Sequence, residues 1–411
     1  MTSAIQKRLA SRPLVIAGAL SFIALLAELG YQTTAVAGMP FFLKDELRLP
    51  VRIITLINVC FLVAETGAKI PFGVLSDRYG RRFFIICGPL LSALAAFAIT
   101  RGPSPNQVAA IRALDGIGEA MLWPALFATV ADVVEERIRA TAMSLFNAMY
   151  IGGIVAGPLL YSGVFSRTGS QVAIFWVLAL FFVMAAGVAY FVSPRRATND
   201  RRPAASGEEV PDASAWRVVR GNPVLMAMLV VAVVQFVGLH MLNGVLSIYL
   251  NEQIHVQKEQ IGHLFLYIGL VVGPFAIPMG RLADRIGKPR AVRLGLGICA
   301  VGMWLLPWVR AVPLLVVTAG IFGIGFLLAS PAWLALMTEL AGDEHRGGVV
   351  GIMNTGQGIG AALGAAVGGS LYDYLGPRAP FLASALLFTV SVLVVFRYVR
   401  RVPAHRQVVI R

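Results

Sequence analysis

The chain has 411 residues, of which 57% are hydrophobic and only 14% charged, and its formal net charge is +14. Its mean hydropathy is +0.76, which excludes a soluble globular protein, because such a protein needs a more polar surface. The apolar runs reach roughly 20 residues or more, the length of a helix that crosses a hydrocarbon core. The alternating strands of about ten residues typical of membrane barrels are not seen. The sequence therefore predicts an all-α membrane protein with several spans.

Twelve predicted spans follow one another along the chain. They cover residues 14–42, 51–75, 83–100, 106–131, 140–165, 171–193, 222–250, 258–281, 291–309, 312–338, 347–371 and 379–397. Lys7, Arg8 and Arg12 precede the first apolar run, as basic residues do in a signal peptide. This run is too long for a signal-peptide core and has no evident cleavage site, so we expect it to be the first span.

The basic residues alternate between the two sides of the predicted membrane. If the N-terminus is cytoplasmic, 25 of the 35 lysines and arginines fall in cytoplasmic segments and 8 in outer loops, while Lys69 and Arg112 lie within spans. This bias predicts that both termini face the cytoplasm. Because the basic residues are dispersed over short loops, the positive charge indicates topology and not nucleic acid binding.

Cys60, Cys87 and Cys299 fall in spans, without disulfide or metal-ligand spacing, and we expect small buried side chains there.

One charged loop occurs twice, as GVLSDRYGRR at 73–82 and as GRLADRIGKPR at 280–290. An offset of 207 residues aligns these loops and further positions without a gap: Pro71 with Pro278, Gly116 and Gly118 with Gly323 and Gly325, Pro124 with Pro331, Arg139 with Arg346, and Asn147, Gly153, Gly157 and Gly169 with Asn354, Gly360, Gly364 and Gly376. The repeat predicts two six-span halves of the same orientation, residues 1–193 and 221–411. Residues 194–220 form a charged Pro/Ala/Ser-rich linker that need not fold.

These features together resemble the major facilitator superfamily. Twelve spans, the six-plus-six repeat and the motif G-x-L-x-D-R-x-G-R/K after spans two and eight carry the resemblance, which covers nearly the whole chain. It implies two pseudo-symmetric six-helix bundles around a central cavity, which work by alternating access. GGIVAGPLLYSG, at 152–163, resembles the antiporter motif of the drug:proton group, except that Tyr161 and Ser162 stand where that motif has two glycines.

We expect the repeated loops to control the conformational change and not to bind substrate. Gly73 and Gly280 would let helices approach closely. Asp77 and Asp284 would accept hydrogen bonds from a helix N-terminus or an arginine across the bundle interface. The predicted conformational gate comprises Gly73, Asp77, Arg78, Arg81, Gly280, Asp284 and Arg285, with Gly153, Gly157 and Pro158 of the antiporter-like motif. The alternative is that the basic loop residues only fix the topology.

Few ionisable residues lie inside spans, and such residues are costly and usually face a cavity or a partner. They are Glu28, Glu65, Lys69, Arg112, Asp115, Glu119 and His240. Arg112, Asp115, Glu119 and Trp123 are spaced to share one helical face. RALDGIGEA also resembles the superfamily's second motif, whose arginine is tied to proton coupling in antiporters and maps onto Arg112, while Asp115 replaces the usual glutamine.

Burial favours a neutral carboxyl and a nearby arginine favours a carboxylate, so a group exposed to both can change protonation as a cavity opens and closes. The predicted proton-coupling set is therefore Glu28, Arg112, Asp115 and Glu119, with Glu28 or Glu119 as carrier and Asp115 next. The alternative is a static pair of Arg112 with Asp115 or Glu28. We expect Glu65 and Lys69 to be first an i,i+4 ion pair and only second cavity residues.

The acidic and basic side chains predicted to lie inside spans are confined to the N-terminal half. The 207-residue offset aligns Glu28 with Gln235, Glu65 with Val272, and Arg112, Asp115 and Glu119 with Ala319, Phe322 and Phe326. The predicted substrate cavity comprises Tyr31, Gln32, Trp123, Asn147, Gln235, Phe236, His240, Asn243, Tyr267, Phe322, Phe326, Trp333, Asn354 and Gln357. Asn147 and Asn354 would line it or bond neighbouring helices, and His240 would be a hydrogen-bonded pore residue or titrate near neutrality. The glycine run from Gly356 to Gly368 predicts helix packing.

The sequence has no nucleotide-binding loop, no catalytic constellation and no metal-ligand spacing, so we expect neither an enzyme nor a cofactor beyond the proton gradient. A negative cavity with aromatic walls favours lipophilic cations or neutral apolar compounds. The prediction is proton-coupled efflux of small amphipathic or drug-like compounds by a monomer in a bacterial inner membrane. A metabolite symporter or uniporter is the alternative, and a non-transporting membrane sensor is the alternative of another class.

Overall fold

The chain is helical throughout the described residues, which are 13–193, 213–342 and 344–399 of the computed structural model. The N-terminal half contains α2 (Pro13–Thr33), the π-helical turns η1 (Thr34–Gly38) and η2 (Phe42–Glu46) with α3 (Met39–Phe41) between them, α4 (Val51–Tyr79), α5 (Arg81–Ile99), α6 (Pro105–Val133), α7 (Glu136–Thr168) and α8 (Gln171–Val192). The C-terminal half contains α9 (Ala213–Gly221), α10 (Pro223–Met241), α11 (Val245–Gln253), η3 (Lys258–Gln260), α12 (Ile261–Val272), η4 (Gly273–Phe275), α13 (Ala276–Ile286), α14 (Lys288–Leu305), η5 (Leu306–Trp308), α15 (Val312–Ala341), α16 (Arg346–Leu375) and α17 (Ala379–Tyr398). The all-α prediction is confirmed.

Ten helical segments of the described chain are long and apolar enough to cross a membrane. The other two long helices, α6 and α16, lie at the positions of predicted spans four and eleven. Neither contains a stretch apolar enough to be among the ten, since α6 carries Arg112, Asp115 and Glu119 and α16 is rich in glycine. Each packs inside its bundle, α6 against α4 and α5, and α16 against α10. The arrangement therefore contains the twelve crossing segments that the sequence predicts.

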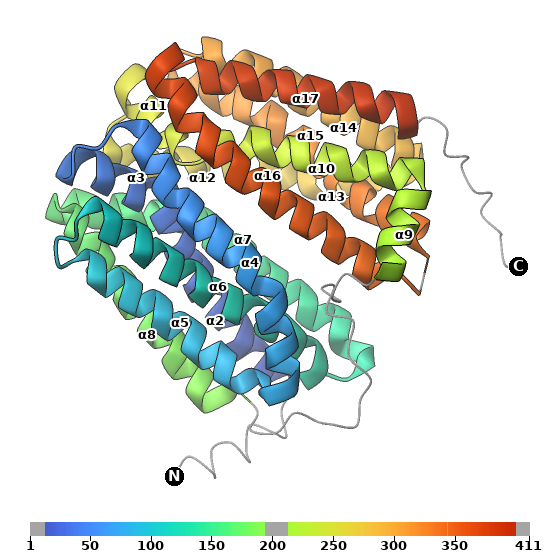
Figure 1. Ribbon diagram of the computed structural model, residues 1–411, viewed down its shortest axis with the longest axis horizontal. Helices are drawn as coiled ribbons and strands as arrows, with labels where there is room; N and C mark the ends of the chain where they lie inside the picture. The colour runs from blue at the N-terminus through green and yellow to red at the C-terminus, as the bar shows by residue number, and fades with distance from the viewer. Residues whose placement is uncertain (1–12, 194–212, 343, 400–411) are drawn as a thin grey trace, which may run out of the picture.

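The internal repeat extends over the whole fold. Helix α4 spans 51–79, and η3 to α13 span 258–286, which is the same interval shifted by 207 residues. Backbone conformations repeat as well: φ is +95° at Gly80 and +87° at Gly287, a region that favours glycine. Helix α2 packs on α7 and α5 on α6, and α10 packs on α16 and α14 on α15 in the same way. Figure 1 shows the resulting two bundles, blue to green and yellow to red.

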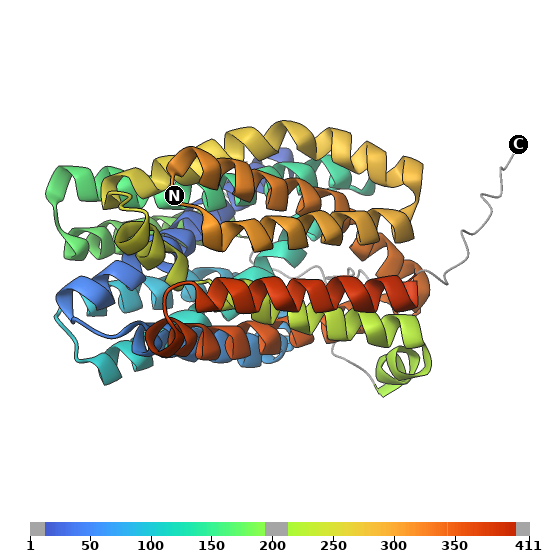
Figure 2. The same cartoon turned by 90° about the horizontal axis from the view of Figure 1, so that it is seen from above.

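The long helices of both bundles run in roughly the same direction, as the two views show (Figures 1 and 2). We call the end where residues 13, 193, 213 and 399 lie the linker end, and the other end, with α3 and α11, the opposite end. The bundles meet chiefly where α4 packs on α16 and α7 packs on α12. In Figure 1 they converge at the opposite end and diverge toward the linker end.

Three predicted segments differ from the structure. Span seven, predicted over 222–250, is broken into α10 and α11 at Leu242–Gly244, where Gly244 has φ +79°. Span eight is interrupted by the short 3₁₀ turn η4. Residues 213–220, assigned to an unfolded linker, belong to helix α9, because Ala215 and Val219 are buried against the C-terminal bundle. The remainder of that linker prediction, 194–212, lies outside the described residues.

Candidate proton and substrate site

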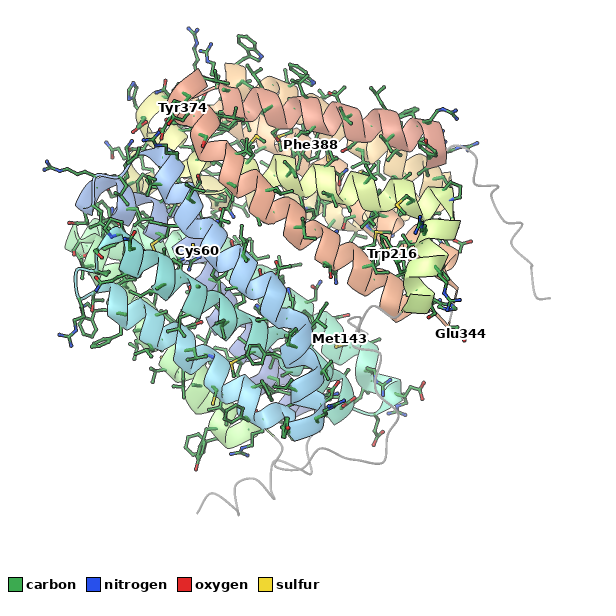
Figure 3. All side chains as sticks on the ribbon, viewed as in Figure 1. Cys60, Met143, Trp216, Glu344, Tyr374 and Phe388 are labelled. Atoms are coloured by element: carbon green, nitrogen blue, oxygen red, sulfur yellow. The ribbon has the colours of Figure 1, made fainter. Side chains whose placement is uncertain are left out.

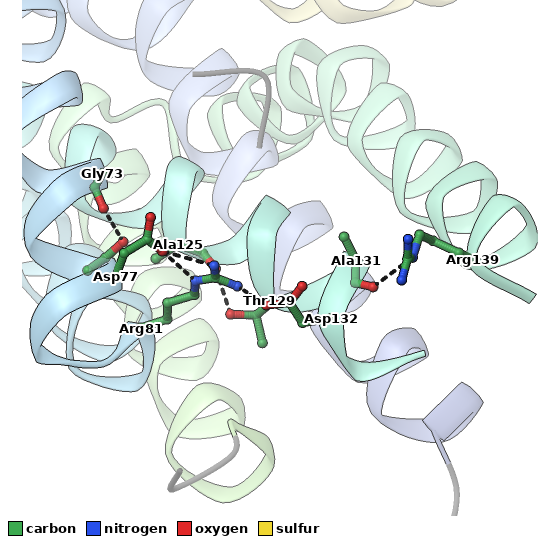
Figure 4. A network of polar contacts seen from close by, with 9 residues as sticks. Gly73, Asp77, Arg81, Ala125, Thr129, Ala131, Asp132 and Arg139 are labelled. Atoms are coloured by element: carbon green, nitrogen blue, oxygen red, sulfur yellow. Dashed lines mark hydrogen bonds and ion pairs between the residues drawn. The ribbon is translucent and has the colours of Figure 1, made fainter. Parts of the chain in front are cut away.

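The repeated loop forms an ion-pair network at the linker end of the N-terminal bundle (Figure 4). Arg81 donates from Nε to Oδ1 of Asp77 at 3.0 Å and from Nη1 to Oδ2 of Asp132 at 2.5 Å. This joins the end of α4 and the start of α5 to the end of α6. The C-terminal half has an equivalent bridge at the same offset, with 2.7 Å between Lys288 Nζ and Glu339 Oε2. The repeated loop therefore ties helices together within each half.

Two expectations for this loop are wrong in the conformation observed. The partner of Asp77 is Arg81 of the same half, not a group across the bundle interface. A Cβ atom added to Gly73 would lie 3.8 Å from Cβ of Pro124, which is ordinary contact, and one added to Gly280 would meet nothing within 4 Å. Close helix approach therefore does not explain these glycines here. Arg78, Asp284 and Arg285 are exposed at the linker end.

The antiporter-like segment of α7 packs tightly against α2. A Cβ atom at Gly153 would lie 2.7 Å from Cβ of Glu28, and one at Gly157 would lie 2.6 Å from Cβ of Gln32. The hydroxyl of Thr33 also donates to the carbonyl oxygen of Gly157 at 2.8 Å. Only glycine permits this approach. The motif thus fixes the part of α2 that carries Glu28 and Gln32, while Pro158 lies beside α12 of the other bundle.

Three carboxyl side chains occupy neighbouring positions in the N-terminal bundle. Glu28 is buried and accepts a hydrogen bond from Nε2 of Gln32 at 2.7 Å. Glu119 accepts from the indole Nε1 of Trp123 at 3.1 Å. Glu65 forms an ion pair with Lys69 at 2.9 Å, as the i,i+4 spacing predicts. We call Glu28, Glu65, Glu119 and Lys69 the acid cluster.

The members of the acid cluster interact electrostatically although they come from three helices. Glu65 and Glu28 both act on Glu119, and Lys69 acts on Glu28 and on Glu119. Tyr150 of α7 lies in the field of the same carboxylates and packs on Trp123, with ring centroids 5.1 Å apart. Tyr150 was not among the residues predicted from the sequence. Its position three residues after Asn147 on the same helix was the available signal, but a lone tyrosine in a span carries little information.

Arg112 and Asp115 form a separate, buried pair that points toward α4 and α5. The guanidinium donates to Oδ2 of Asp115 and, from Nη2, to Oδ1 of Asn58 at 3.3 Å. It also lies 4.1 Å from the ring centroid of Phe61, a cation–π distance. Tyr31 hydrogen-bonds Ser92 of α5 at 2.9 Å. Within the predicted four-residue set, Arg112 thus holds Asp115 while Glu28 and Glu119 have neutral hydrogen-bond donors, and Glu119 also interacts electrostatically with the Arg112–Asp115 pair.

The C-terminal bundle presents neutral groups toward the acid cluster. His240 stacks on Phe236 with ring centroids 5.4 Å apart, and its Nδ1 lies 3.2 Å from the Phe236 carbonyl oxygen. Phe236 packs with Phe61 and Leu62 of α4, the helix that carries Glu65. Nε2 of Gln235 is buried without a hydrogen-bond partner among the described residues. The predicted asymmetry between a charged and a neutral half is present in the fold.

An apolar cavity of about 490 Å³ lies in the C-terminal bundle, where it reaches α7 and η1 of the other bundle. Two predicted cavity residues, Asn243 and Phe322, line it. The other candidates lie elsewhere: Asn147 and Asn354 are exposed, Tyr267 and Phe326 are each 50% exposed, Gln357 is half-buried, and Trp333 packs against the hydrophobic core near the linker end. This cavity thus contains two of the fourteen predicted cavity residues.

The two bundles are bonded together at the opposite end. Lys44 pairs with Glu252 at 3.0 Å, and Lys258 pairs with Asp45 at 2.6 Å. Asp373 of α16 accepts hydrogen bonds from the first backbone amides of α4, 2.8 Å from the nitrogen of Arg52. Arg52 also lies 5.2 Å from the ring centroid of Tyr374, which Figure 3 labels at this end. These contacts hold the opposite end closed.

Comparisons with known proteins agree with this geometry. A model of the Major Facilitator Superfamily matches residues 20–242 and again residues 228–410. Multidrug resistance protein 1 of Bacillus subtilis (strain 168) is 24% identical over 369 residues, which cover 88% of this chain and 91% of that protein. The Phosphoglycerate transporter protein of Salmonella typhimurium (strain LT2) is 26% identical over 374 residues, which cover 82% and 78%.

Solved structures show the same fold at low sequence identity. The crystal structure of a bacterial homolog to the human lysosomal transporter Spinster, in an inward-facing and unoccupied conformation, matches with a TM-score of 0.76 at 15% identity. The match covers 95% of this chain and 97% of that one.

Proposed function

The chain belongs to the Major Facilitator Superfamily and is a membrane transporter, not an enzyme, and we propose that it exports small amphipathic compounds in exchange for protons. Transport would proceed by alternating access, with the observed conformation closed at the opposite end. The similarity to Multidrug resistance protein 1 supports efflux. The distribution of basic residues supports cytoplasmic termini, which makes the closed end the external one, in a bacterial inner membrane. We propose that the monomer is the transporting unit and that the proton gradient drives transport without another cofactor.

The acid cluster is the observation that carries proton coupling. It holds three carboxyl groups and one cation, Lys69, which Glu65 already binds at 2.9 Å. Glu28 and Glu119 instead accept hydrogen bonds from neutral side chains, Gln32 and Trp123. Carboxyl groups that face each other in a bundle resist simultaneous ionisation, so one of them readily holds a proton. A compound that enters beside them with a positive charge replaces that proton, and this competition couples the two fluxes.

The geometry also favours the substrate class. The acid cluster attracts a cation, and the aromatic side chains Trp123, Tyr150 and Phe236 supply the apolar and π surfaces that lipophilic cations bind. Arg112 does not offset this negative field with a free positive charge, because it is paired with Asp115. We therefore propose lipophilic cations, such as ethidium, as substrates.

Proton movement in proteoliposomes tests the proposal. Purified protein is reconstituted with an internal pH dye, and an ethidium gradient is imposed on wild type, Glu28→Gln and Glu119→Gln, with Glu136→Gln at an exposed position as the matched control. We expect ethidium to drive an opposite proton flux in wild type and in the control, and at least one cluster variant to lose it by more than tenfold. Ethidium movement without any proton response in wild type would reject proton exchange.

A second function is supported by one comparison. The similarity to the Phosphoglycerate transporter protein makes an anionic metabolite a candidate substrate. Three carboxyl groups beside the translocation route would repel such an anion, which places this function second. The same proteoliposomes distinguish the two: uptake of radiolabelled 3-phosphoglycerate, with no transport of ethidium, would favour the metabolite transporter.

A further inference from the structure

The apolar cavity of the C-terminal bundle occupies the position that the buried ion pair fills in the N-terminal bundle. Under the 207-residue offset, Arg112 and Asp115 align with Ala319 and Phe322, and both of the latter line the cavity. The aromatic neighbour of Arg112, Phe61, aligns with Ile268, which also lines it. The same architectural site thus holds a charged network in one half and an empty apolar volume in the other.

At three lining positions the second half has a smaller residue than the first half. Ala319 replaces Arg112, Gly269 replaces Leu62, and Gly302 replaces Ala95, and all three replacements line the cavity. The helices pack in the same order in the two halves: α14 packs on α15 as α5 packs on α6. An unfilled apolar volume is costly to stability, so a ligand that fills it gains the contacts that the side chains would have made.

The polar groups of the cavity wall are nearly all engaged within the protein. The Ser247 hydroxyl donates to the carbonyl oxygen of Val36 across the bundle interface, and the Thr318 hydroxyl donates to that of Leu314 at 2.8 Å. The side chain of Asn243 makes no hydrogen bond with the described residues, although it lines the cavity. Asn243 is therefore the side chain whose amide can give or accept a hydrogen bond from a ligand.

We infer that this cavity is a second binding site, which takes an uncharged aromatic compound and orients it by one hydrogen bond to Asn243. Its size lies in the range of small-molecule sites, about 300–1,000 Å³. Because the wall contains no charged side chain, recognition there is independent of the acid cluster. The inference rests on the proposed function in that the ligand is a transported compound or its apolar part. It adds neutral aromatic compounds to the lipophilic cations that the acid cluster attracts.

Two neutral probes of similar size test the site. N-phenyl-1-naphthylamine has one N–H donor, and 1-phenylnaphthalene has none. Binding of both is measured by fluorescence on the full chain in nanodiscs at a single pH, with empty nanodiscs subtracted. The variants are Ala319→Phe, which fills the cavity, Asn243→Leu, which removes the amide, and Val317→Phe as the matched control, because Val317 is 55% exposed on the same helix. The assay needs no proton gradient, so its failure is distinct from a failure of proton exchange.

We expect Ala319→Phe to weaken binding of both probes by at least tenfold while Val317→Phe leaves both unchanged. Asn243→Leu should weaken binding of the amine by about threefold to tenfold, the effect of one hydrogen bond, and leave 1-phenylnaphthalene unchanged. Equal binding in Ala319→Phe and Val317→Phe would overturn the site. Equal loss of both probes in Asn243→Leu would overturn the orienting role. Displacement of the amine by oleate, with amine transport retained in Ala319→Phe, would assign the cavity to membrane lipid and overturn a substrate site.

Discussion

The pair of Arg112 and Asp115 is the most buried ion pair of the described residues, and its burial carries a prediction. Both side chains are buried, and Arg112 also contacts Asn58 and Phe61. Removal of one partner from a buried pair costs about 3–5 kcal/mol, because the other charge stays uncompensated. We therefore expect Asp115→Asn to lower thermal stability strongly in detergent, measured as a fall in Tm.

The double variant Arg112→Gln/Asp115→Asn separates a structural pair from a proton-coupling one. With both charges removed, the uncompensated charge disappears, and we expect most of the lost Tm to return. If the pair is structural, the double variant also exchanges ethidium for protons at the wild-type rate. If Arg112 takes part in coupling, the double variant folds and binds ethidium but moves no protons. A double variant less stable than Asp115→Asn would contradict the account of the pair.

At this scale, helix periodicity predicted which residues share a face but not which partners they choose. Spacing alone grouped Arg112, Asp115 and Glu119. In the fold, Arg112 donates hydrogen bonds to Asp115 and to Asn58 of α4, whereas Glu119 accepts one from Trp123. Asn58 lies on a different helix, and its approach depends on how α4 and α6 pack. No pattern in either segment contains that information.

Helix α7 is the element on which the site most depends, and its glycines carry a specific prediction. A Cβ atom at Gly157 would lie 2.6 Å from Cβ of Gln32 and 2.9 Å from the backbone nitrogen of Thr33. Gly157→Ala should therefore displace α2 and lower stability by about 1–3 kcal/mol, the usual cost of overpacking. Gly163→Ala is the matched control on the same helix, because its Cβ would meet only the end of Arg167 at 3.6 Å.

Thermal unfolding and ethidium transport report on this pair of variants together. We expect Gly163→Ala to be neutral or slightly stabilising, since alanine favours a helix by about 1 kcal/mol over glycine. Gly157→Ala should lose both Tm and transport because Glu28 moves with α2. Equal Tm values for the two variants would show that α2 does not need the close approach.

The helix ends were largely predictable from the sequence, because the internal repeat constrains them twice. The intervals of α4, α5 and α6 recur at 207 residues in the second half. The break between α10 and α11 was missed because the apolar run continues on both sides of it, although Asn243 and Gly244 form a dipeptide that is typical of turns. Helix α9 was missed because its stability comes from Ala215 and Val219 against the C-terminal bundle, a tertiary contact outside a charged segment.

At the scale of the whole molecule, we expect the ion pairs at the opposite end to favour the observed conformation. Lys44 and Asp45 are adjacent in η2 and reach Glu252 and Lys258 of the other bundle, so each bundle contributes one cation and one anion. Part-exposed pairs are worth only about 0.2–1 kcal/mol each, yet 1.4 kcal/mol changes a conformational ratio tenfold. Lys44→Glu replaces attraction with repulsion at the point where the bundles meet. We therefore expect this variant to open the opposite end and close the linker end.

Double electron–electron resonance distances measure both ends at once. Cys60, Cys87 and Cys299 are replaced first, because the spin label would otherwise react with these free cysteines inside the bundles. Figure 3 labels Cys60. Labels at Arg101 and Arg310 then report the opposite end, and labels at Glu135 and Glu344 report the linker end, because all four residues are exposed.

Lys44→Glu should lengthen the distance between the labels at the opposite end and shorten the distance between those at the linker end. Lys44→Glu/Glu252→Lys should restore both distances. Opposite changes at the two ends are required because rigid bundles that part at one end approach at the other. Unchanged distances in Lys44→Glu would mean that the remaining contacts, such as Asp373 with the amides of α4 and Gly262 beside Pro158, suffice to keep the opposite end closed.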